Sequence, residues 1–158
     1  MATDNTRKER PLSETEYIPD GYTAVTPYLV AEDAPGLIDF LANAFGAVER
    51  MRIPRPDGGI RHAEVVIGGD AIMLGSVALP EFKLTTAHIN LYVEDVDSAY
   101  ASAMGAGATS VQEPANQVYG DRGACITDPA GNTWSLSSPA EDITEEEVRS
   151  RLKALDDA

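Results

Sequence analysis

The feature that most constrains this chain is an internal repeat. Residues 26–33, TPYLVAED, align without a gap on residues 88–95, HINLYVED, after a shift of 62 residues. At the same shift residues 69–74 align on residues 131–136, whereas residues 46–47 meet residues 107–108 one position out of step. Unrelated segments would not keep one phase over this length, so we predict that the chain folds as two copies of one unit.

Each copy has the pattern of a strand, a helix and three further strands. Apolar and β-branched runs predict strands, the spacing of apolar residues over 37–45 predicts a helix, and Gly46 marks the end of that helix. Predicted elements of the first copy are strands at 24–31, 48–53, 60–67 and 71–75; those of the second are strands at 87–93, 109–112, 118–127 and 132–137, with a helix over 94–104. We therefore predict an α+β fold in which two tandem βαβββ modules form a curved, incomplete mixed β-barrel with a central cavity.

The length of 158 residues suits one domain. Near the carboxyl end Thr144 and Glu147 form a capping box, which predicts a helix with Val148, Leu152 and Leu155 on one face. The predicted division is a flexible leader at 1–20, a single domain at 21–138 and a C-terminal helix within 139–158; the domain holds module one at 22–76, a connector at 77–85 and module two at 86–138.

Composition excludes several classes of function. The formal charge of −14, from 26 acidic and 12 basic side chains, disfavours nucleic-acid binding and favours cationic ligands. No apolar stretch is long enough for a membrane span and the polar start is unlike a signal peptide, so we expect a cytoplasmic protein with no membrane partner. The lone Cys125 allows no internal disulfide and no multi-cysteine metal site, and it reads as a small apolar strand residue.

Alternation along the predicted strands assigns each side chain to one face. Residues expected under the helices are Leu29, Ile72, Leu74, Leu91, Val93, Trp134 and Leu136. Residues expected to face the cavity are Thr26, Tyr28, Val30, Ala71, Met73, His88, Asn90, Tyr92, Thr133 and Ser135.

Several strings resemble one known family. YGDRGACITDPAGNTWSL at 119–136 and LYVEDVD at 91–97, together with VTPYLV and FLANAFGA in the first module, resemble the glyoxalase-like proteins of the vicinal oxygen chelate superfamily, which also includes bleomycin-resistance proteins and dioxygenases. The resemblance covers residues 22–138. Its DPxGN string is a turn with specific demands, since Asp and Asn bond turn amides, Pro sets φ and Gly takes a positive φ.

The resemblance also implies where a metal ion would be held. Metal-dependent members place one ligand at the start of the first strand and one on the last strand of each module, which here are Thr26, Met73, His88 and Ser135. Only the imidazole is a good ligand, so the resemblance implies a member with a degenerate metal site and no cofactor. A different set, His62 and Glu64 with His88, would give two imidazoles and a carboxylate if the strands converge, although a His–Glu pair is more often a hydrogen-bonding pair.

Arg122 and the tyrosines have two interpretations each. The arginine forms an ion pair with Asp121 or Asp128, the favoured interpretation, or clamps a substrate carboxylate. Tyr28 and Tyr92, on inward positions, either stack on a flat ligand or, like Tyr119, have a purely structural role.

These patterns favour a metal-independent binder of a small aromatic or cationic molecule, similar to the drug-sequestering, antibiotic-resistance branch of the superfamily. The alternatives are a glyoxalase-like lyase or isomerase, metal-dependent or with His88 as general base, and an assembly module whose cavity is filled by its own side chains. We expect a homodimer, because modules pair between subunits as easily as within one. Candidate ligand-binding residues are Thr26, Tyr28, His62, Glu64, Met73, His88, Asn90, Tyr92, Tyr119, Arg122 and Ser135.

Overall fold

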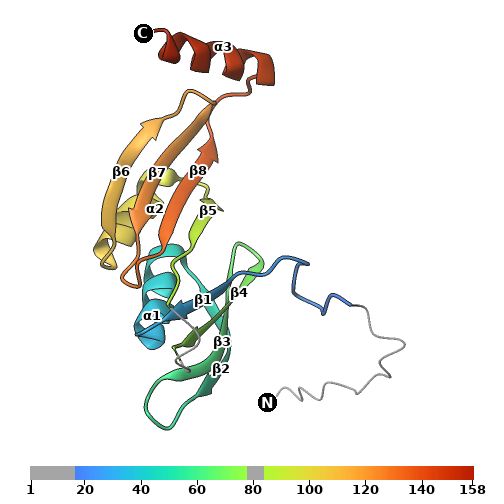
Figure 1. The fold of residues 1–158 in the computed structure, drawn as a ribbon, viewed down its shortest axis with the longest axis vertical. Helices are drawn as coiled ribbons and strands as arrows, with labels where there is room; N and C mark the ends of the chain where they lie inside the picture. Colours follow the sequence, from blue (N-terminus) through green and yellow to red (C-terminus); the bar gives the residue numbers. More distant parts are fainter. Residues whose placement is uncertain (1–16, 78–83) are drawn as a thin grey trace.

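The fold is that of two βαβββ modules followed by a helix, seen in a computed structural model that describes residues 17–77 and 84–158 (Figure 1). Most of the predicted leader and connector lie outside these described residues. The predicted α+β class with two modules is confirmed. The elements are β1 (Tyr28–Ala31), α1 (Ala34–Phe45), β2 (Val48–Pro54), β3 (Ile60–Ile67), β4 (Asp70–Ser76), β5 (His88–Tyr92), α2 (Val96–Gly105), β6 (Thr109–Asn116), β7 (Asp121–Thr127), β8 (Thr133–Pro139) and α3 (Glu145–Asp156).

Each module forms its own four-stranded mixed sheet. The orders are β1-β4-β3-β2 and β5-β8-β7-β6, with the first strand of each module parallel to its last and the other neighbours antiparallel. Tyr28 lies opposite Met73 in one sheet, and Asn90 lies opposite Ser135 in the other. The 62-residue shift seen in the sequence is therefore kept in the strand register.

Local signals account for the two module helices. Asp33 caps α1 by accepting a hydrogen bond from the Gly36 amide, and Gly46 ends that helix in the left-handed region with φ of 66°. Asp95 caps α2 through the Ser98 amide. The two helices cover sheet residues predicted to lie beneath them: α1 covers the first sheet, with Leu29 and Leu74, and α2 covers the second, with Trp134 and Leu136, all nearly fully buried.

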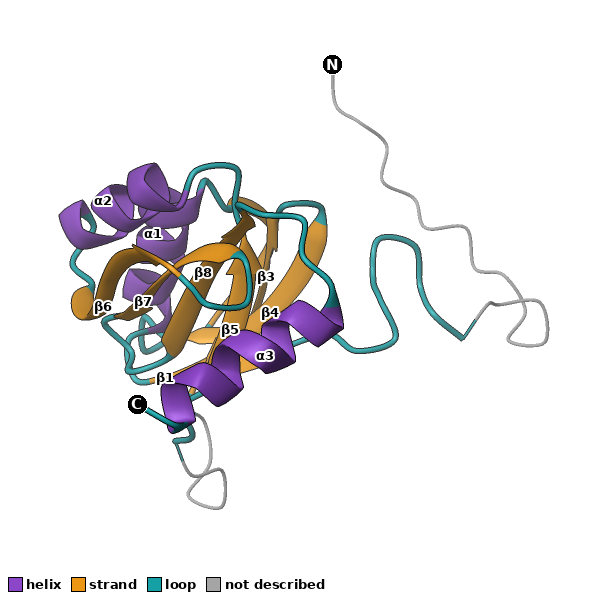
Figure 2. Cartoon of the chain, turned by 90° about the horizontal axis from the view of Figure 1, so that it is seen from above, coloured by secondary structure: helices purple, strands orange, loops and turns teal. Residues whose placement is uncertain are grey.

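The sheets remain open, which refines the expected barrel. Among the described residues no strand of one sheet pairs with a strand of the other, and the modules meet chiefly where α1 contacts α2. Figure 2 shows these two helices together on one side of the molecule, with the strands on the other. The second face of each sheet, here called the open face, is consequently not enclosed by the other module of the same chain.

Two predicted strands begin later than expected. Residues 24–27 precede β1, and Thr26 donates its hydroxyl hydrogen to the Thr23 carbonyl in a local turn. Only the Pro27 carbonyl in this segment bonds to the sheet backbone, accepting from the Met73 amide at 3.0 Å. Residues 118–120 form the turn before β7, closed by a hydrogen bond from the Gly120 amide to the Gln117 carbonyl. The strand β6, in contrast, continues past the predicted residue 112 to Asn116.

The C-terminal helix α3 is capped as predicted, with the Thr144 hydroxyl accepting from the Glu147 amide at 3.2 Å. It lies beyond the end of module two and away from α1 and α2 (Figures 1 and 2). Leu152 and Leu155 on its apolar face remain 44% and 58% exposed. In the described part of the chain, no helix has the length and apolar character needed to cross a membrane.

Candidate binding faces

The open face of module one is the sheet face opposite α1. Along β3 the residues Ala63, Val65 and Ile67 are buried toward the helix, so His62 and Glu64 point to the open face. Met73 lies opposite Glu64 on β4, and Tyr28 lies opposite Met73 on β1. Three neighbouring strands thus bring four of the predicted site residues together.

Glu64 is the centre of a polar network on this face. Its residue surface is only 3% exposed. One carboxylate oxygen accepts hydrogen bonds from the Tyr22 hydroxyl at 2.6 Å and from His62 Nε2 at 3.1 Å. The other accepts from Nε and Nη2 of Arg50, at 2.9 and 2.7 Å. A buried carboxylate needs such partners, and here both oxygens have two.

This network fixes the charge of Glu64. Burial alone pushes the pKa of the carboxyl upward, but hydrogen bonds from Tyr22, His62 and Arg50, with the positive charge of the guanidinium, lower it from 4.5 to about 2. The hydrogen bond to Glu64 in turn raises the pKa of the Tyr22 hydroxyl. The Arg50 guanidinium also stacks over the Tyr22 ring, 4.4 Å from its centroid. Glu64 is therefore a fixed anion that orients its neighbours.

The segment that precedes β1 forms a pocket beside this network. The Arg50 Nη1 group donates to the Gly21 carbonyl at 3.1 Å, which holds the segment against the sheet. A cavity of about 320 Å³ lies there and includes the predicted site residues Thr26 and Met73. Its lining residues are Tyr17, Ile18, Pro19, Tyr22, Thr23, Ala24, Thr26 and Met73.

The open face of module two carries neutral polar groups. His88 Nε2 and the Ser135 hydroxyl are 2.8 Å apart, across the parallel pair β5 and β8. The Ser137 hydroxyl donates to Asn90 Oδ1 at 3.1 Å. Tyr92 ends β5 with 68% of its surface exposed. His88, Asn90 and Tyr92, which alternate along β5, are all exposed to solvent.

Tyr119 and Arg122 flank the turn before β7. Burial raises the pKa of the Tyr119 hydroxyl, although 48% of the residue is exposed. The predicted ion pair of Arg122 with Asp121 or Asp128 is wrong, because the guanidinium pairs with Asp97 on α2 and also donates to Asn116. Asp128 is used inside the DPxGN turn, where it accepts from Ala130, Asn132 and Trp134. Arg122 thus ties β7 to α2.

The side chains at the positions of the superfamily's metal ligands do not fit a metal ion. Thr26 gives its hydroxyl hydrogen to a backbone carbonyl, Met73 supplies a thioether, and His88 is bonded to Ser135. The alternative set is not assembled within one chain either, since His62 and Glu64 lie on the first sheet and His88 on the second. Within the ranges 17–77 and 84–158, no three His, Cys, Asp or Glu residues cluster as metal ligands.

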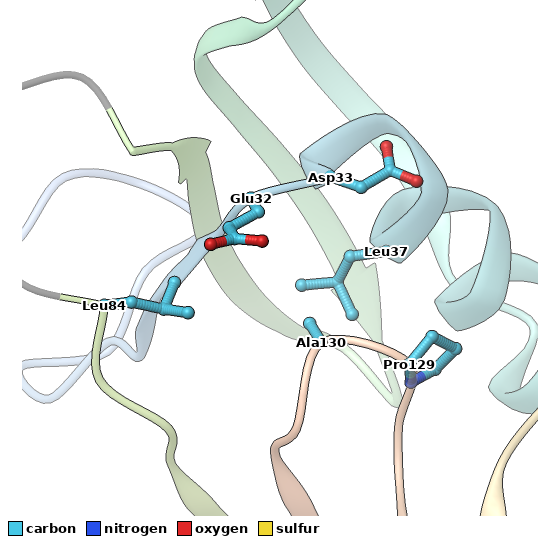
Figure 3. Close-up of a pocket in the computed structure, with 6 residues that line it drawn as sticks. All are labelled: Glu32, Asp33, Leu37, Leu84, Pro129 and Ala130. Atoms are coloured by element: carbon cyan, nitrogen blue, oxygen red, sulfur yellow. The ribbon is translucent and has the colours of Figure 1, made fainter.

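A separate small cavity lies at the junction of the modules, away from the open faces. Its volume is about 180 Å³, and the β1–α1 turn and the turn before β8 form its walls (Figure 3). Asp33, one of its acidic residues, is already used to cap α1. The lining residues are Glu32, Asp33, Leu37, Leu84, Pro129 and Ala130.

Sequence reasoning missed Tyr22 and Arg50 as partners of Glu64. A signal existed, because a carboxylate between Ala63 and Val65 on a largely buried strand requires a cation or several donors. Strand alternation could not identify Arg50, because β2 carries an irregularity between Glu49 and Met51 that places an extra residue there. The extra residue is Arg50, and its guanidinium lies on the open face beside Glu64.

Comparisons with known proteins agree with this architecture. Residues 21–136 match the family described as Glyoxalase/Bleomycin resistance protein/Dioxygenase superfamily. An uncharacterized protein of Mycobacterium tuberculosis is 37% identical over 144 residues, covering 85% of this chain and 85% of that protein. The crystal structure of TioX from Micromonospora sp. ML1 has a TM-score of 0.64 at 26% identity, covering 74% of this chain and 98% of TioX. FosX, a fosfomycin resistance protein from Listeria monocytogenes, shares the fold with a TM-score of 0.57 at 19% identity, covering 80% of this chain and 97% of FosX.

Proposed function

The chain belongs to the glyoxalase/bleomycin resistance protein/dioxygenase superfamily, as its motifs predicted, and on that premise we propose that it binds a small organic molecule without a metal ion. The observation that carries the proposal is the exposure of aromatic side chains on well-formed sheet faces: Tyr28 is 50% and Tyr92 is 68% exposed. Rings in such positions, beside a few fixed polar groups, suit a flat ligand. The shared fold of a fosfomycin resistance protein is consistent with a drug-sequestering role.

The chemistry of the faces narrows the ligand class to aromatic or cationic compounds. On module one, Arg50 is committed to Glu64 and so does not attract an anion. Met51 and Ile53 on β2 add apolar surface, 39% and 43% exposed. The chain as a whole carries a formal charge of −14, which repels phosphates and carboxylates and attracts cations.

The proposal includes a homodimer acting in the cytoplasm. Because the two open faces do not meet within one chain, a second copy would be needed to bring module two over module one and enclose a chamber. Exposed Val48 and Val111, at 66% and 60%, lie on the outer strands of the two sheets and would gain cover in this way. Size-exclusion chromatography with light scattering tests the dimer, and a monomer at all concentrations would contradict it.

Calorimetry against a panel of aromatic and cationic compounds, antibiotics among them, tests the binding function. We expect micromolar or tighter binding of at least one compound and a loss of about tenfold or more in Tyr28→Ala and in Tyr92→Ala, because each removes a stacking surface. Leu155→Ala is the matched control, since it removes an exposed apolar side chain from α3 and should leave binding unchanged. Failure of the whole panel to bind would count against the function.

A second candidate function is a lyase or isomerase that uses His88 as general base. The observation in its favour is the 2.8 Å contact between His88 Nε2 and the Ser135 hydroxyl, which orients the ring on an exposed face. A metal-dependent version would need two chains, since His62 and Glu64 lie on the other sheet. Metal analysis of protein purified without chelator separates the versions: stoichiometric divalent metal that is lost in His88→Ala would favour the enzyme.

A further inference from the structure

The network on module one dictates which nitrogen of His62 carries hydrogen. The Glu64 carboxylate is ionised, so it accepts hydrogen bonds and donates none. Its contact with His62 Nε2, at 3.1 Å, therefore requires a hydrogen on Nε2. In the neutral ring the other nitrogen, Nδ1, then has a free lone pair and acts as an acceptor.

Within the described part of the chain, His62 Nδ1 has only a long contact with a hydrogen-bond donor. The Tyr28 hydroxyl approaches His62 Nδ1 to 3.4 Å, which is long for a hydrogen bond between a hydroxyl and a nitrogen. A ligand hydroxyl that reaches Nδ1 at an ordinary distance would displace it at little cost. Since Tyr28 is half exposed and the His62 side chain is 23% exposed, solvent reaches both groups.

The backbone makes room for this pair. A Cβ atom at Gly75 would lie 3.1 Å from the Tyr28 hydroxyl oxygen and 3.2 Å from the Arg61 carbonyl oxygen. A side chain at this position would crowd the Tyr28 hydroxyl, which would have to move by a few tenths of an ångström. The two rings lie 5.8 Å apart between centroids and are inclined by 38°, so they form an aromatic wall. Ile53, opposite His62 on β2, extends the wall with apolar surface.

From this arrangement we propose that His62 Nδ1, held by Glu64 and flanked by Tyr28, recognises the hydroxyl group of a phenolic ligand. The ligand donates its O–H hydrogen to Nδ1 and lays its ring against Tyr28 and Ile53. A molecule of the same shape without a hydroxyl hydrogen loses the hydrogen bond and leaves Nδ1 without a partner. This site deepens the proposed binding function and rests on it.

The two probes for the test are para-cresol and para-methylanisole, which differ in the hydrogen that the site would recognise; the cresol keeps its hydroxyl hydrogen at a pH where an imidazole is neutral. Calorimetry should show the phenol binding about tenfold more tightly than its methyl ether to the full chain. In His62→Phe this difference should disappear, whereas in His88→Phe, which changes the histidine of module two, it should persist. Tyr28→Phe should retain the preference, because it removes the competing hydroxyl and keeps the ring.

Nitrogen-15 NMR gives a readout that does not depend on affinity. The chain has two histidines, so His88→Phe leaves a single ring in the spectrum. At a pH where the ring is neutral, His62 should carry its hydrogen on Nε2, and Glu64→Gln should mix the two tautomers. Addition of para-cresol should shift the Nδ1 resonance, and para-methylanisole should not.

The inference would be overturned by equal affinity for the two probes, by an unchanged preference in His62→Phe, or by hydrogen on Nδ1 in the free protein. Failure of both probes to bind would overturn it too. The wider calorimetric panel, which includes compounds without hydroxyl groups, would still decide the proposed binding function by itself. The two proposals can therefore fail separately.

Discussion

The open faces of the two modules have the same backbone plan and opposite chemistry. The register places Cys125 of module two where module one has Glu64, and Ser135 where module one has Met73. Module one thus holds an ion pair with a buried carboxylate that fixes its side chains, and module two holds small polar groups and a thiol at the matching positions. One repeated sheet can therefore provide one half of a site whose side chains are fixed by an ion pair and another half whose side chains are not.

Removing the Glu64 carboxylate should give the largest difference in stability between the two modules. Glu64→Ala leaves the Arg50 guanidinium without its partner and should lower the free energy of unfolding by about 3 kcal/mol, the lower end for a buried pair because the Arg50 side chain is 32% exposed. Cys125→Ala at the matching position should cost less than about 1 kcal/mol. Urea denaturation followed by circular dichroism measures both, and equal losses would show that the modules are held alike.

The dependence of stability on pH tests the same difference between the modules. Because the pKa of Glu64 in the folded chain, about 2, lies below its ordinary value of 4.5, its stabilising contribution is complete above pH 4.5 and is lost as the pH falls toward 2. We expect a loss of about 2 kcal/mol between pH 4.5 and about pH 2.5 from this group. Comparing the pH dependence of unfolding in the native sequence and in Glu64→Gln isolates it. Identical slopes in the two proteins would be the contrary result.

A smaller effect is expected where side chains of different size occupy matching positions of the two modules. In module one the long Tyr28 side chain reaches over Gly75, whereas in module two the short Asn90 side chain accepts a hydrogen bond from Ser137. Gly75→Ser should crowd the tyrosine and cost about 1 kcal/mol, and Ser137→Gly should cost about as much by removing a hydrogen bond. Thermal unfolding of the two variants measures these losses. An unchanged Gly75→Ser protein would mean that the tyrosine moves freely.

The sequence predicted the element order and the buried side of the first and last strand of each module, because the repeat and the alternation of apolar residues are visible in the sequence itself. It could not predict which side chains satisfy Glu64 or Arg122. Arg50 reaches Glu64 through an irregular strand, and Asp97 is 25 positions from Arg122 and lies on a helix. Nor could strand patterns show that the sheets of one chain stay apart, since alternation defines a face and not what covers it.

The strand irregularity at Arg50 has a counterpart, since β6 departs from regular register between Ser110 and Gln112, at Val111. The inserted residue therefore belongs to the backbone plan that the two halves share. The same bulge displays an arginine in one half and a valine in the other, so a single backbone feature presents a charge on one sheet and an apolar group on the other.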